Sequence, residues 1–394
     1  MKNKTISKLG FATFLIVAFY IFMVVFEGKV NFSKDTLQFA IDWPKLNKVV
    51  LSKNSNDLEI VKSEKGTWEL PQKNNFPASE VMMRSLFLKL MDISTSEKIQ
   101  VSPSGIEKLG LNESGKASGH GIISLSYPES EAGKIFLGAL RSRKGETMEN
   151  EIALTGEYVR FSQSDQVFIL PMAINLQTDV KEWLSKDILD EKLADVYEFV
   201  VYHKSEDSKE LVESYAAVRD DKLFLKDEAK FVLKKPLADG KEAKSSLINE
   251  VGQSLENLTL EDVEPSSKDE FKTIAIDGKV VYKLMDGEVI EVNFFRLEER
   301  HFVKISTILD TSLAKDISEK YNVFKSESKD TSNIRELPVA SDADVDQRND
   351  QFSKWIYEIN GSVYSNISKD SKALIEEAKA PAIDTPPAEM VFPE

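Results

Sequence analysis

The residue types that most often carry chemistry are few or scattered in this 394-residue chain. Its three histidines, His120, His203 and His301, lie far apart in the sequence. No two have the H-x-x-x-H spacing that brings two imidazoles to one face of a helix. The chain has no cysteine, which excludes a thiolate nucleophile, thiolate zinc ligands and disulfides. We expect no metal and no cofactor to be bound through these residues.

Two glycine-containing motifs for nucleophiles and phosphates also fail. Ser118 stands in "GKASGHG", where Lys116 replaces the first glycine of a nucleophile elbow. Gly115 and Lys116 are followed by Ala117 and lack the earlier glycine of a phosphate-binding loop. The segment is more typical of a connection between elements than of a catalytic loop.

The clearest candidate for metal binding is the acidic segment "DADVDQRNDQFS" from Asp342. Asp342, Asp344 and Asp346 have the spacing of the first three ligands of a calcium loop. Gln347 replaces the glycine needed for the turn, and Ser353 replaces the closing bidentate glutamate. We therefore predict a solvated acidic loop. Carboxylates are abundant elsewhere, so an acid/base pair stays open as an alternative.

The charge balance limits the class of partner. The chain has 51 basic and 66 acidic residues and a formal net charge of −15. A chain this acidic repels phosphate backbones, so we expect no nucleic-acid partner. Hydrophobic residues make up 41%, enough for packed cores, and the length favours two domains.

The N-terminal segment predicts a membrane anchor. Lys2, Lys4 and Lys8 precede an apolar run over 9–26, which as a helix reaches roughly 27 Å, close to the thickness of a bilayer core. No small-x-small cleavage site follows it. We expect an uncleaved transmembrane anchor at 9–27 in a bacterial inner membrane, with residues 1–8 cytoplasmic and the bulk of the chain periplasmic.

Behind the anchor, the patterns predict a first α+β module over 35–190. Strands at 46–54 and 57–71 lead to a helix at 79–93, whose apolar residues recur every three or four positions. Glu80, Arg84 and Lys89 take the other faces of this helix and are the residues that we expect to face a partner. An antiparallel meander at 122–171 follows, and 181–189 closes the module as an amphipathic helical turn.

A second α+β module is predicted over 195–370. Strands at 196–204 and 214–226, a helix at 242–258 and a meander at 272–309 repeat the order of the first module, with Leu86 matched to Leu247. The predicted fold class is therefore α+β, with two repeated modules of antiparallel sheet and one main helix each. The proline-rich tail at 380–394 is expected to be disordered.

Several of these segments resemble one known family. "KGTWELP", "FPASEVMMRSLFLKLMDI", "GIEKLGL", "IFLGAL", "EYVRFSQSDQVFIL" and "KEWLSKDIL" are similar to the bacterial family called domain of unknown function 4340. The acidic insertion "RSRKGETMENEIALTG" departs from its pattern. The residues that match the family pattern have structural reasons, such as core filling, helix ends or turns, and are Trp68, Pro77, Ala78, Leu109, Gly110, Leu111, Gly138 and Trp183.

The resemblance implies one N-terminal anchor and an extracytoplasmic repeated region, often encoded beside an ABC transporter permease and its ATPase. It implies no catalytic residues. We therefore expect a non-enzymatic binding or scaffolding subunit associated with such a transporter. An envelope glycan or peptide hydrolase with an Asp/Glu pair and a carrier of an apolar ligand such as a lipid remain the alternatives.

Overall fold

The computed structural model describes residues 41–377 except 94–95, 145–151, 190, 206, 208–209, 236, 238–240, 257 and 329–333. The predicted anchor at 9–27 and the tail at 380–394 lie outside the described residues. The described chain forms two compact units. Unit 1 contains residues up to Glu69 and Glu80–Glu182, and unit 2 contains Leu70–Ser79 and the chain from Trp183 onward. Both are α+β with antiparallel sheets, as expected.

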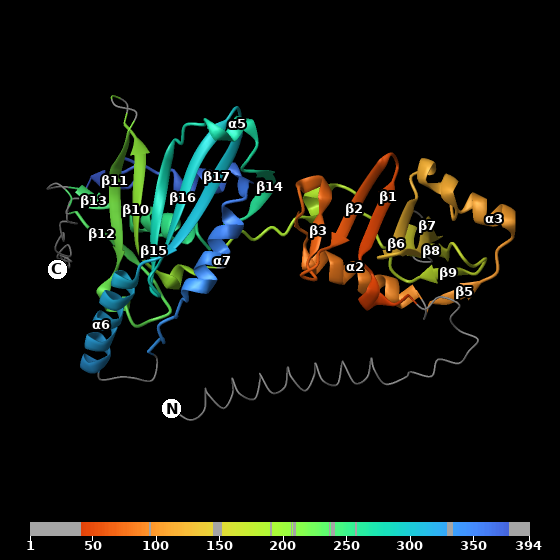
Figure 1. Ribbon diagram of the computed structural model, residues 1–394, viewed down its shortest axis with the longest axis horizontal. Coiled ribbons are helices and arrows are strands. Elements are labelled where there is room, and N and C mark those ends of the chain that lie inside the picture. Colours follow the sequence, from red (N-terminus) through yellow and green to blue (C-terminus); the bar gives the residue numbers. More distant parts are fainter. Residues whose placement is uncertain are drawn as a thin grey trace, which may run out of the picture. The chain divides into compact units, whose positions relative to one another are not determined.

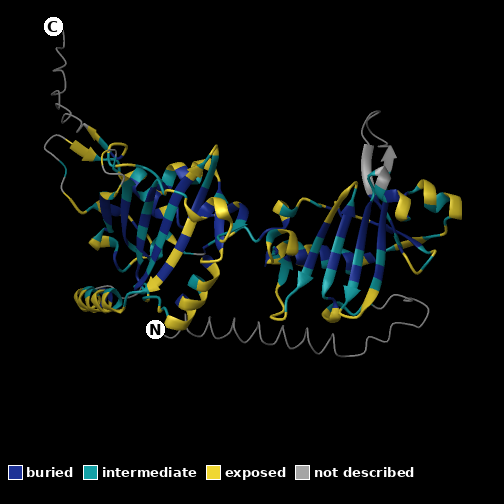
Figure 2. Cartoon of the chain, turned by 45° about the horizontal axis from the view of Figure 1, so that its top comes forward, coloured by how far each residue is buried: buried dark blue, intermediate teal, exposed yellow. Residues whose placement is uncertain are grey.

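Unit 1 is built on a long antiparallel sheet with the strand order β4-β3-β2-β1-β6-β7-β8-β9-β5, in which β4 and the last residue of β3, Leu70, are assigned to unit 2. Along its central strands, buried residues alternate with residues of intermediate exposure, as expected for a sheet with one face in a core (Figure 2). The strands are β1 (Lys48–Lys53), β2 (Asn56–Lys62), β3 (Trp68–Leu70), β4 (Phe76–Pro77), β5 (Glu97–Ile99), β6 (Gly121–Tyr127), β7 (Ser130–Lys144), β8 (Ile152–Phe161) and β9 (Val167–Leu170).

Two α-helices accompany this sheet, α2 (Glu80–Asp92) and α3 (Pro103–Lys108). Helix α2 confirms the predicted helix at 79–93, and it buries Met83, Leu86 and Leu90 on one face. Ser102 begins α3, because its hydroxyl accepts a hydrogen bond from the Gly105 amide at 3.2 Å.

Unit 2 contains a second antiparallel sheet with the order β12-β11-β10-β15-β16-β17-β18-β14. The two sheets follow the same connectivity: β1, β2 and β3 correspond to β10, β11 and β12, and β5 to β14. The strands are β10 (Val196–Lys204), β11 (Leu211–Arg219), β12 (Phe231–Leu233), β14 (Leu260–Pro265), β15 (Gly278–Leu284), β16 (Glu288–Leu297), β17 (Arg300–Leu309) and β18 (Trp355–Ile359), and a small sheet pairs β13 (Lys241–Ala243) with β19 (Ile375–Glu377).

The prediction of one main helix per module is wrong for unit 2. It contains α4 (Ser245–Gln253), α5 (Asp269–Lys272), α6 (Thr311–Glu327), α7 (Asp342–Phe352) and α8 (Gly361–Ile367). Helices α6 and α7 are inserted between β17 and β18, where unit 1 joins β8 to β9 directly. Helix α7 packs on β17 (Figure 1). The predicted meander at 272–309 also begins too early, since residues 273–277 have no strand structure and its first strand is β15, from Gly278.

Two further segments differ from the expected module. The helical turn predicted at 181–189 is a short 3-10 helix, Val180–Trp183, followed by isolated bridges. Leu70–Ser79, which the sequence pattern places in the first module, belongs to unit 2. There Phe76 packs its ring 5.2 Å from Trp355, and the Ala78 backbone bridges to Leu184.

Candidate functional site: a groove along helix α2

Two of the three histidines lie in one aromatic cluster of unit 2. The His203 ring lies 5.8 Å from Phe294, Phe294 lies 5.6 Å from Tyr364, and Tyr364 lies 4.6 Å from His301. Among the described residues, no group of three or more histidine, aspartate or glutamate side chains is arranged to hold a metal ion. The contacts of the two histidines in this cluster are ring packing contacts. Tyr364 also donates a hydrogen bond from its hydroxyl to Asp277 at 2.8 Å.

The acidic segment at 342–353 is not the loop that the sequence predicts. It forms α7, because the Ser341 side chain accepts from the Asp344 amide and begins a helix there. Asp342 and Asp344 lie in its first turn, where carboxylates are stabilised by the helix dipole. In this structure, Asp342 and Asp344 therefore stabilise the N-terminus of α7.

One buried and one partly buried carboxylate, Glu288 and Glu191, converge on one arginine of α7. Arg348 donates to Glu191 at 2.5 Å and also to Glu288, whose second oxygen accepts from the Thr307 hydroxyl at 2.5 Å. Burial raises the pKa of both glutamates, although Arg348 opposes the rise. The Glu288 side chain is 0% exposed, so it offers no carboxylate oxygen to a substrate in this structure. The ion pair between Arg348 and Glu288 joins α7 to β16 of the sheet.

Four of the residues singled out in the sequence come together in unit 1. Gly110 ends the turn after α3 with a φ of +71°, and Leu111 is fully buried in a cluster with Ile122 and Phe136. The Leu109 carbonyl accepts from the Ala139 amide at 2.9 Å. A Cβ on Gly138 would lie 2.5 Å from that same carbonyl oxygen, so this approach requires glycine.

The other four members of that set are divided between the units. Trp68 on β3 of unit 1 is half-buried, with its ring 5.6 Å from Phe87 of α2. Pro77, Ala78 and Trp183 meet in unit 2, where the Ser79 amide donates to the Trp183 carbonyl at 2.7 Å and Trp183 is buried. These contacts are packing contacts.

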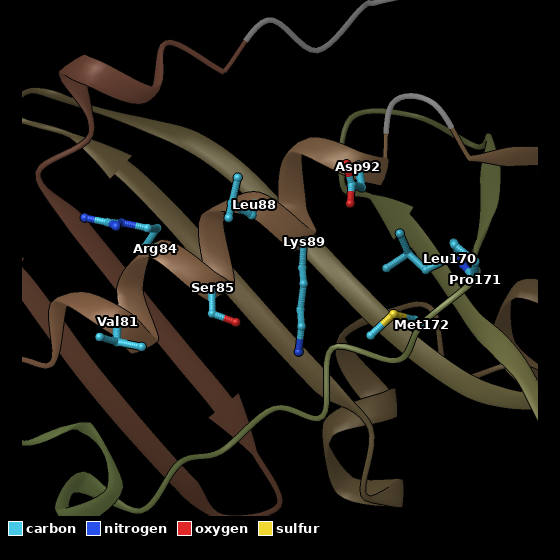
Figure 3. A pocket seen from close by; sticks show the side chains of 9 residues that line it. All are labelled: Val81, Arg84, Ser85, Leu88, Lys89, Asp92, Leu170, Pro171 and Met172. Carbon is cyan, nitrogen blue, oxygen red and sulfur yellow. The ribbon is translucent and has the colours of Figure 1, made fainter. Parts of the chain in front are cut away.

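An apolar groove of about 400 Å³ runs along the outer face of α2 in unit 1 (Figure 3). One wall is the helix, and the other is the chain that leaves β9. The exposed fractions of three of its apolar residues are unusually high, at 78% for Val81, 54% for Leu88 and 70% for Met172. The full lining is Val81, Arg84, Ser85, Leu88, Lys89, Asp92, Leu170, Pro171 and Met172.

Two of the three residues predicted to face a partner line this groove. Arg84 is exposed, and Lys89 is half-buried with its ammonium group donating to the Ile174 carbonyl at 3.3 Å. Glu80 is exposed at the start of α2 but is not among the lining residues. Asp92 is the one carboxylate in the lining, so two cationic side chains face one anionic side chain in a protein that is acidic as a whole.

Residues 68–277 match the model of a family described as Domain of unknown function (DUF4340). The chain belongs to this family. No curated protein and no solved structure matches it. Within the described part of the chain, no helix is long and apolar enough to cross a membrane.

In this DUF4340 protein, the helix equivalent to α2 has a different outer face. The buried residues Met83, Leu86 and Leu90 of α2 align with Ile248, Val251 and Leu255 around α4. This alignment replaces the earlier match of Leu86 with Leu247. It places the polar residues Ser246, Glu250 and Gln253 of α4 where α2 has Val81, Ser85 and Leu88.

Unit 2 also has a helix beside α4 that unit 1 does not have beside α2 among the described residues. Helix α8 packs against α4 and β17, and Lys369 just after it pairs with Glu250 at 2.9 Å. In unit 1, the chain after the corresponding strand β9 continues through Pro171 and Met172 without a helix. The outer-face residues Ser246, Glu250 and Gln253 of α4 are nevertheless exposed, so the outer faces of the two helices differ in polarity and not in burial.

The apolar members of the groove were missed from the sequence. Val81 and Leu88 are seven residues apart, two helical turns, and stand outside the stripe that predicts the buried face. This second stripe was a usable signal. Met172 lies far away in the sequence and joins the groove only because β9 ends beside α2.

Proposed function

We propose that this protein is a non-enzymatic binding subunit, anchored in the bacterial inner membrane, that holds a transporter partner through the groove along α2. The observation that carries the proposal is the contrast between the two equivalent helices. Val81 and Leu88 are exposed apolar residues where α4 has Ser246 and Gln253. A contiguous exposed apolar surface with polar residues at its rim is typical of a protein interaction site.

The groove favours a short amphipathic helix as the bound segment. Unit 2 carries such a helix, α8, directly after the strand that corresponds to β9, and its Tyr364 and Ile367 are buried. A helix that enters a groove presents apolar residues at spacings of three, four and seven, which fits a wall formed by Val81, Leu88 and Met172. Arg84 and Lys89 favour acidic residues beside that apolar stripe.

The membrane location and the kind of partner come from the sequence. The apolar run at 9–26 has the length of a membrane span, and the family resemblance implies an ABC transporter permease as a neighbour. The partner segment is accordingly an acidic, amphipathic helix of an integral membrane transporter subunit, exposed on the periplasmic side.

Photo-crosslinking in intact membranes tests this function. The photoreactive residue p-benzoylphenylalanine replaces Ser85 in the groove, and in a matched control it replaces Ser246 at the outer face of α4. We expect a crosslinked adduct with a transporter permease subunit from position 85 and none from position 246. Mass spectrometry of the adduct identifies the crosslinked partner.

Three results would contradict the proposal. These are no adduct from position 85, the same adducts from both positions, or an adduct from position 85 that contains only lipid or a second copy of this chain. A lipid adduct would instead support the alternative of an apolar-ligand carrier. Adding Val81→Glu and Leu88→Glu to the Ser85 variant should abolish the permease adduct, because both place a carboxylate in the apolar wall.

A further inference from the structure

A second pocket, of about 350 Å³, lies in unit 1 close to the point where the described chain begins. It is separate from the groove along α2, with which it shares no residue. Its volume falls in the range of about 300–1,000 Å³ that is usual for small-ligand sites. The lining residues are Pro44, Lys45, Leu46, Asn47, Lys62, Ser63 and Pro128.

Two side-chain oxygens in this pocket's residues have no hydrogen-bond partner within the described structure. They are the amide oxygen of Asn47 and the hydroxyl oxygen of Ser63, and both atoms are buried. A buried polar atom without a partner costs free energy, and nearly all such atoms in folded proteins are satisfied. Asn47 Oδ1 can only accept, so a ligand that satisfies both oxygens must bring hydroxyl or N–H donors.

The charged residues of the pocket are both lysines. Lys45 has a 74% exposed side chain and pairs with Asp42 at 2.7 Å, and the Lys62 ammonium lies 5.9 Å from the centre of the Trp68 ring. No carboxylate belongs to the lining. The two ammonium groups outnumber the one carboxylate beside them, Asp42, so the pocket keeps a net positive charge that favours an anion.

Two tryptophans stand beside these lysines. Trp43 and Trp68 are half-buried, and each places its ring 5.6 Å from Phe87. Tryptophan and lysine together are typical of protein surfaces at the headgroup level of a membrane, because each combines an apolar body with a polar end.

We infer that this pocket binds a glycerol phosphate group, as carried by the headgroup of phosphatidylglycerol or by the free ester. The phosphate pairs with the ammonium groups of Lys45 and Lys62, and the glycerol hydroxyls donate hydrogen bonds to Asn47 Oδ1 and Ser63 Oγ. The inference rests on the membrane location in the proposed function, but not on the groove.

The position of the pocket in the chain agrees with a bilayer surface. The predicted anchor ends at 27 and the pocket begins at Pro44, which leaves 16 residues between them. At about 3.3–3.6 Å per residue, such a segment spans at most roughly 55 Å. The headgroups of the bilayer that holds the anchor are therefore within reach.

Lysine acetylation of the full-length protein in lipid nanodiscs tests the inference. The discs contain phosphatidylcholine alone, or phosphatidylcholine with either phosphatidylglycerol or phosphatidylserine. The serine lipid carries the same net charge without the glycerol headgroup. We expect Lys45 and Lys62 to be acetylated at least threefold more slowly with phosphatidylglycerol than with phosphatidylserine. Lys235 of unit 2, whose side chain is 80% exposed, is the control and should be acetylated at the same rate with both lipids.

A double variant and a free ligand complete the experiment. Asn47→Ala with Ser63→Ala keeps both lysines and should remove most of the added protection. Glycerol phosphate added to the protein in non-ionic detergent identifies the free ester as a ligand if it protects the same lysines. Equal acetylation with the two anionic lipids, together with no protection by glycerol phosphate, would overturn the inference. The permease adduct from position 85 is unaffected by this double variant, so the two proposals fail separately.

Discussion

Leu88 of α2 and Gln253 of α4 occupy equivalent positions in the two units, but only Leu88 is apolar. The two helices bury matching sets of residues against sheets of the same connectivity. Since the packing of the inner faces is alike, the difference on the outer faces does not come from the fold. It separates a unit whose helix has a polar outer face from a unit whose helix has an apolar one.

The first prediction concerns Leu88→Gln, which gives α2 the residue that α4 has. A substitution at a side chain this exposed should change the free energy of unfolding by no more than about 0.5 kcal/mol. Loss of a buried leucine from an interface should weaken partner binding at least about tenfold, since burying such a side chain contributes about 1.5–3 kcal/mol. The amount of permease that copurifies in mild detergent measures the effect.

The reverse substitution, Gln253→Leu, is the matched control. It adds an apolar residue at the exposed outer face of α4 and should create no permease binding. If Leu88→Gln retained as much permease as the unaltered protein, the groove would not be the contact surface.

The second prediction concerns Arg219, which is 1% exposed on β11. Its guanidinium donates to four backbone carbonyls, those of Ala194, Leu223, Lys226 and Glu228. Burial lowers its pKa to about 10, so it stays protonated at neutral pH. Arg219→Met leaves these carbonyls without a donor and should destabilise unit 2 by more than about 3 kcal/mol, at about 1–3 kcal/mol for each unsatisfied buried group.

The urea concentration at half-unfolding, followed by circular dichroism, measures this loss. Arg296→Met is the comparison, because the Arg296 side chain is 62% exposed and its substitution should have little effect. Similar midpoints for the two variants would show that the Arg219 network contributes no stability.

The third prediction concerns Gly138→Ala on β7. The added Cβ would lie 2.5 Å from the Leu109 carbonyl oxygen and 2.7 Å from the Leu111 side chain. Overpacking of this kind should destabilise unit 1 by about 1–3 kcal/mol. Gly361→Ala is a control at the first residue of α8, where the nearest contact is 3.3 Å from His301. Equal thermal midpoints for both variants would contradict this reading of Gly138.

The parts of the fold that local patterns determine were predictable. Helix α2 followed from apolar residues at helical spacing, and the sheets followed from short alternating runs divided by turns. Even the repeated order of elements was visible. These patterns involve residues close together in the sequence, so they can be recognised without knowing the tertiary contacts.

Helices α6 and α7 were missed for two different reasons. Helix α6 carries Leu313, Ile317, Tyr321 and Phe324 at helical spacing, and Asp310 caps it through the Ser312 and Leu313 amides, so its signal was present but overlooked. Helix α7 buries only Val345 and Phe352, so its periodicity is too weak to compete with its acidic composition.

The contribution of Leu70–Ser79 to unit 2 could not be predicted from local patterns. Phe76 packs on Trp355 and Tyr357, which lie nearly 280 positions further along the chain. The same limit applies to the groove, because Met172 meets α2 only through the path of β9. Arg84 and Lys89 were predictable as exposed positions, and Val81 and Leu88 carried a signal that was missed, whereas the part of Met172 in the groove could not be predicted.

The last prediction concerns Arg348, which pairs with the partly buried carboxylate of Glu191 and the buried carboxylate of Glu288. Arg348→Met leaves both without their cation and should destabilise unit 2 by about 3–5 kcal/mol at pH 7. Burial already raises the pKa of both groups above the value expected in the unfolded chain, and removal of Arg348 raises it further. Protonation therefore favours the folded state, so their contribution to stability falls as pH rises through the folded-state pKa.

The cost of Arg348→Met should accordingly be smaller at pH 4.5 than at pH 7, because the orphaned carboxylates are then protonated more fully. Urea unfolding at the two pH values measures the difference. Lys354→Met, which breaks the exposed pair with Asp350 just after α7, should have an effect below about 1 kcal/mol at both. A cost of Arg348→Met that is constant or larger at pH 4.5 would show that the two glutamates do not carry the buried charge, and that Arg348 stabilises α7 through packing alone.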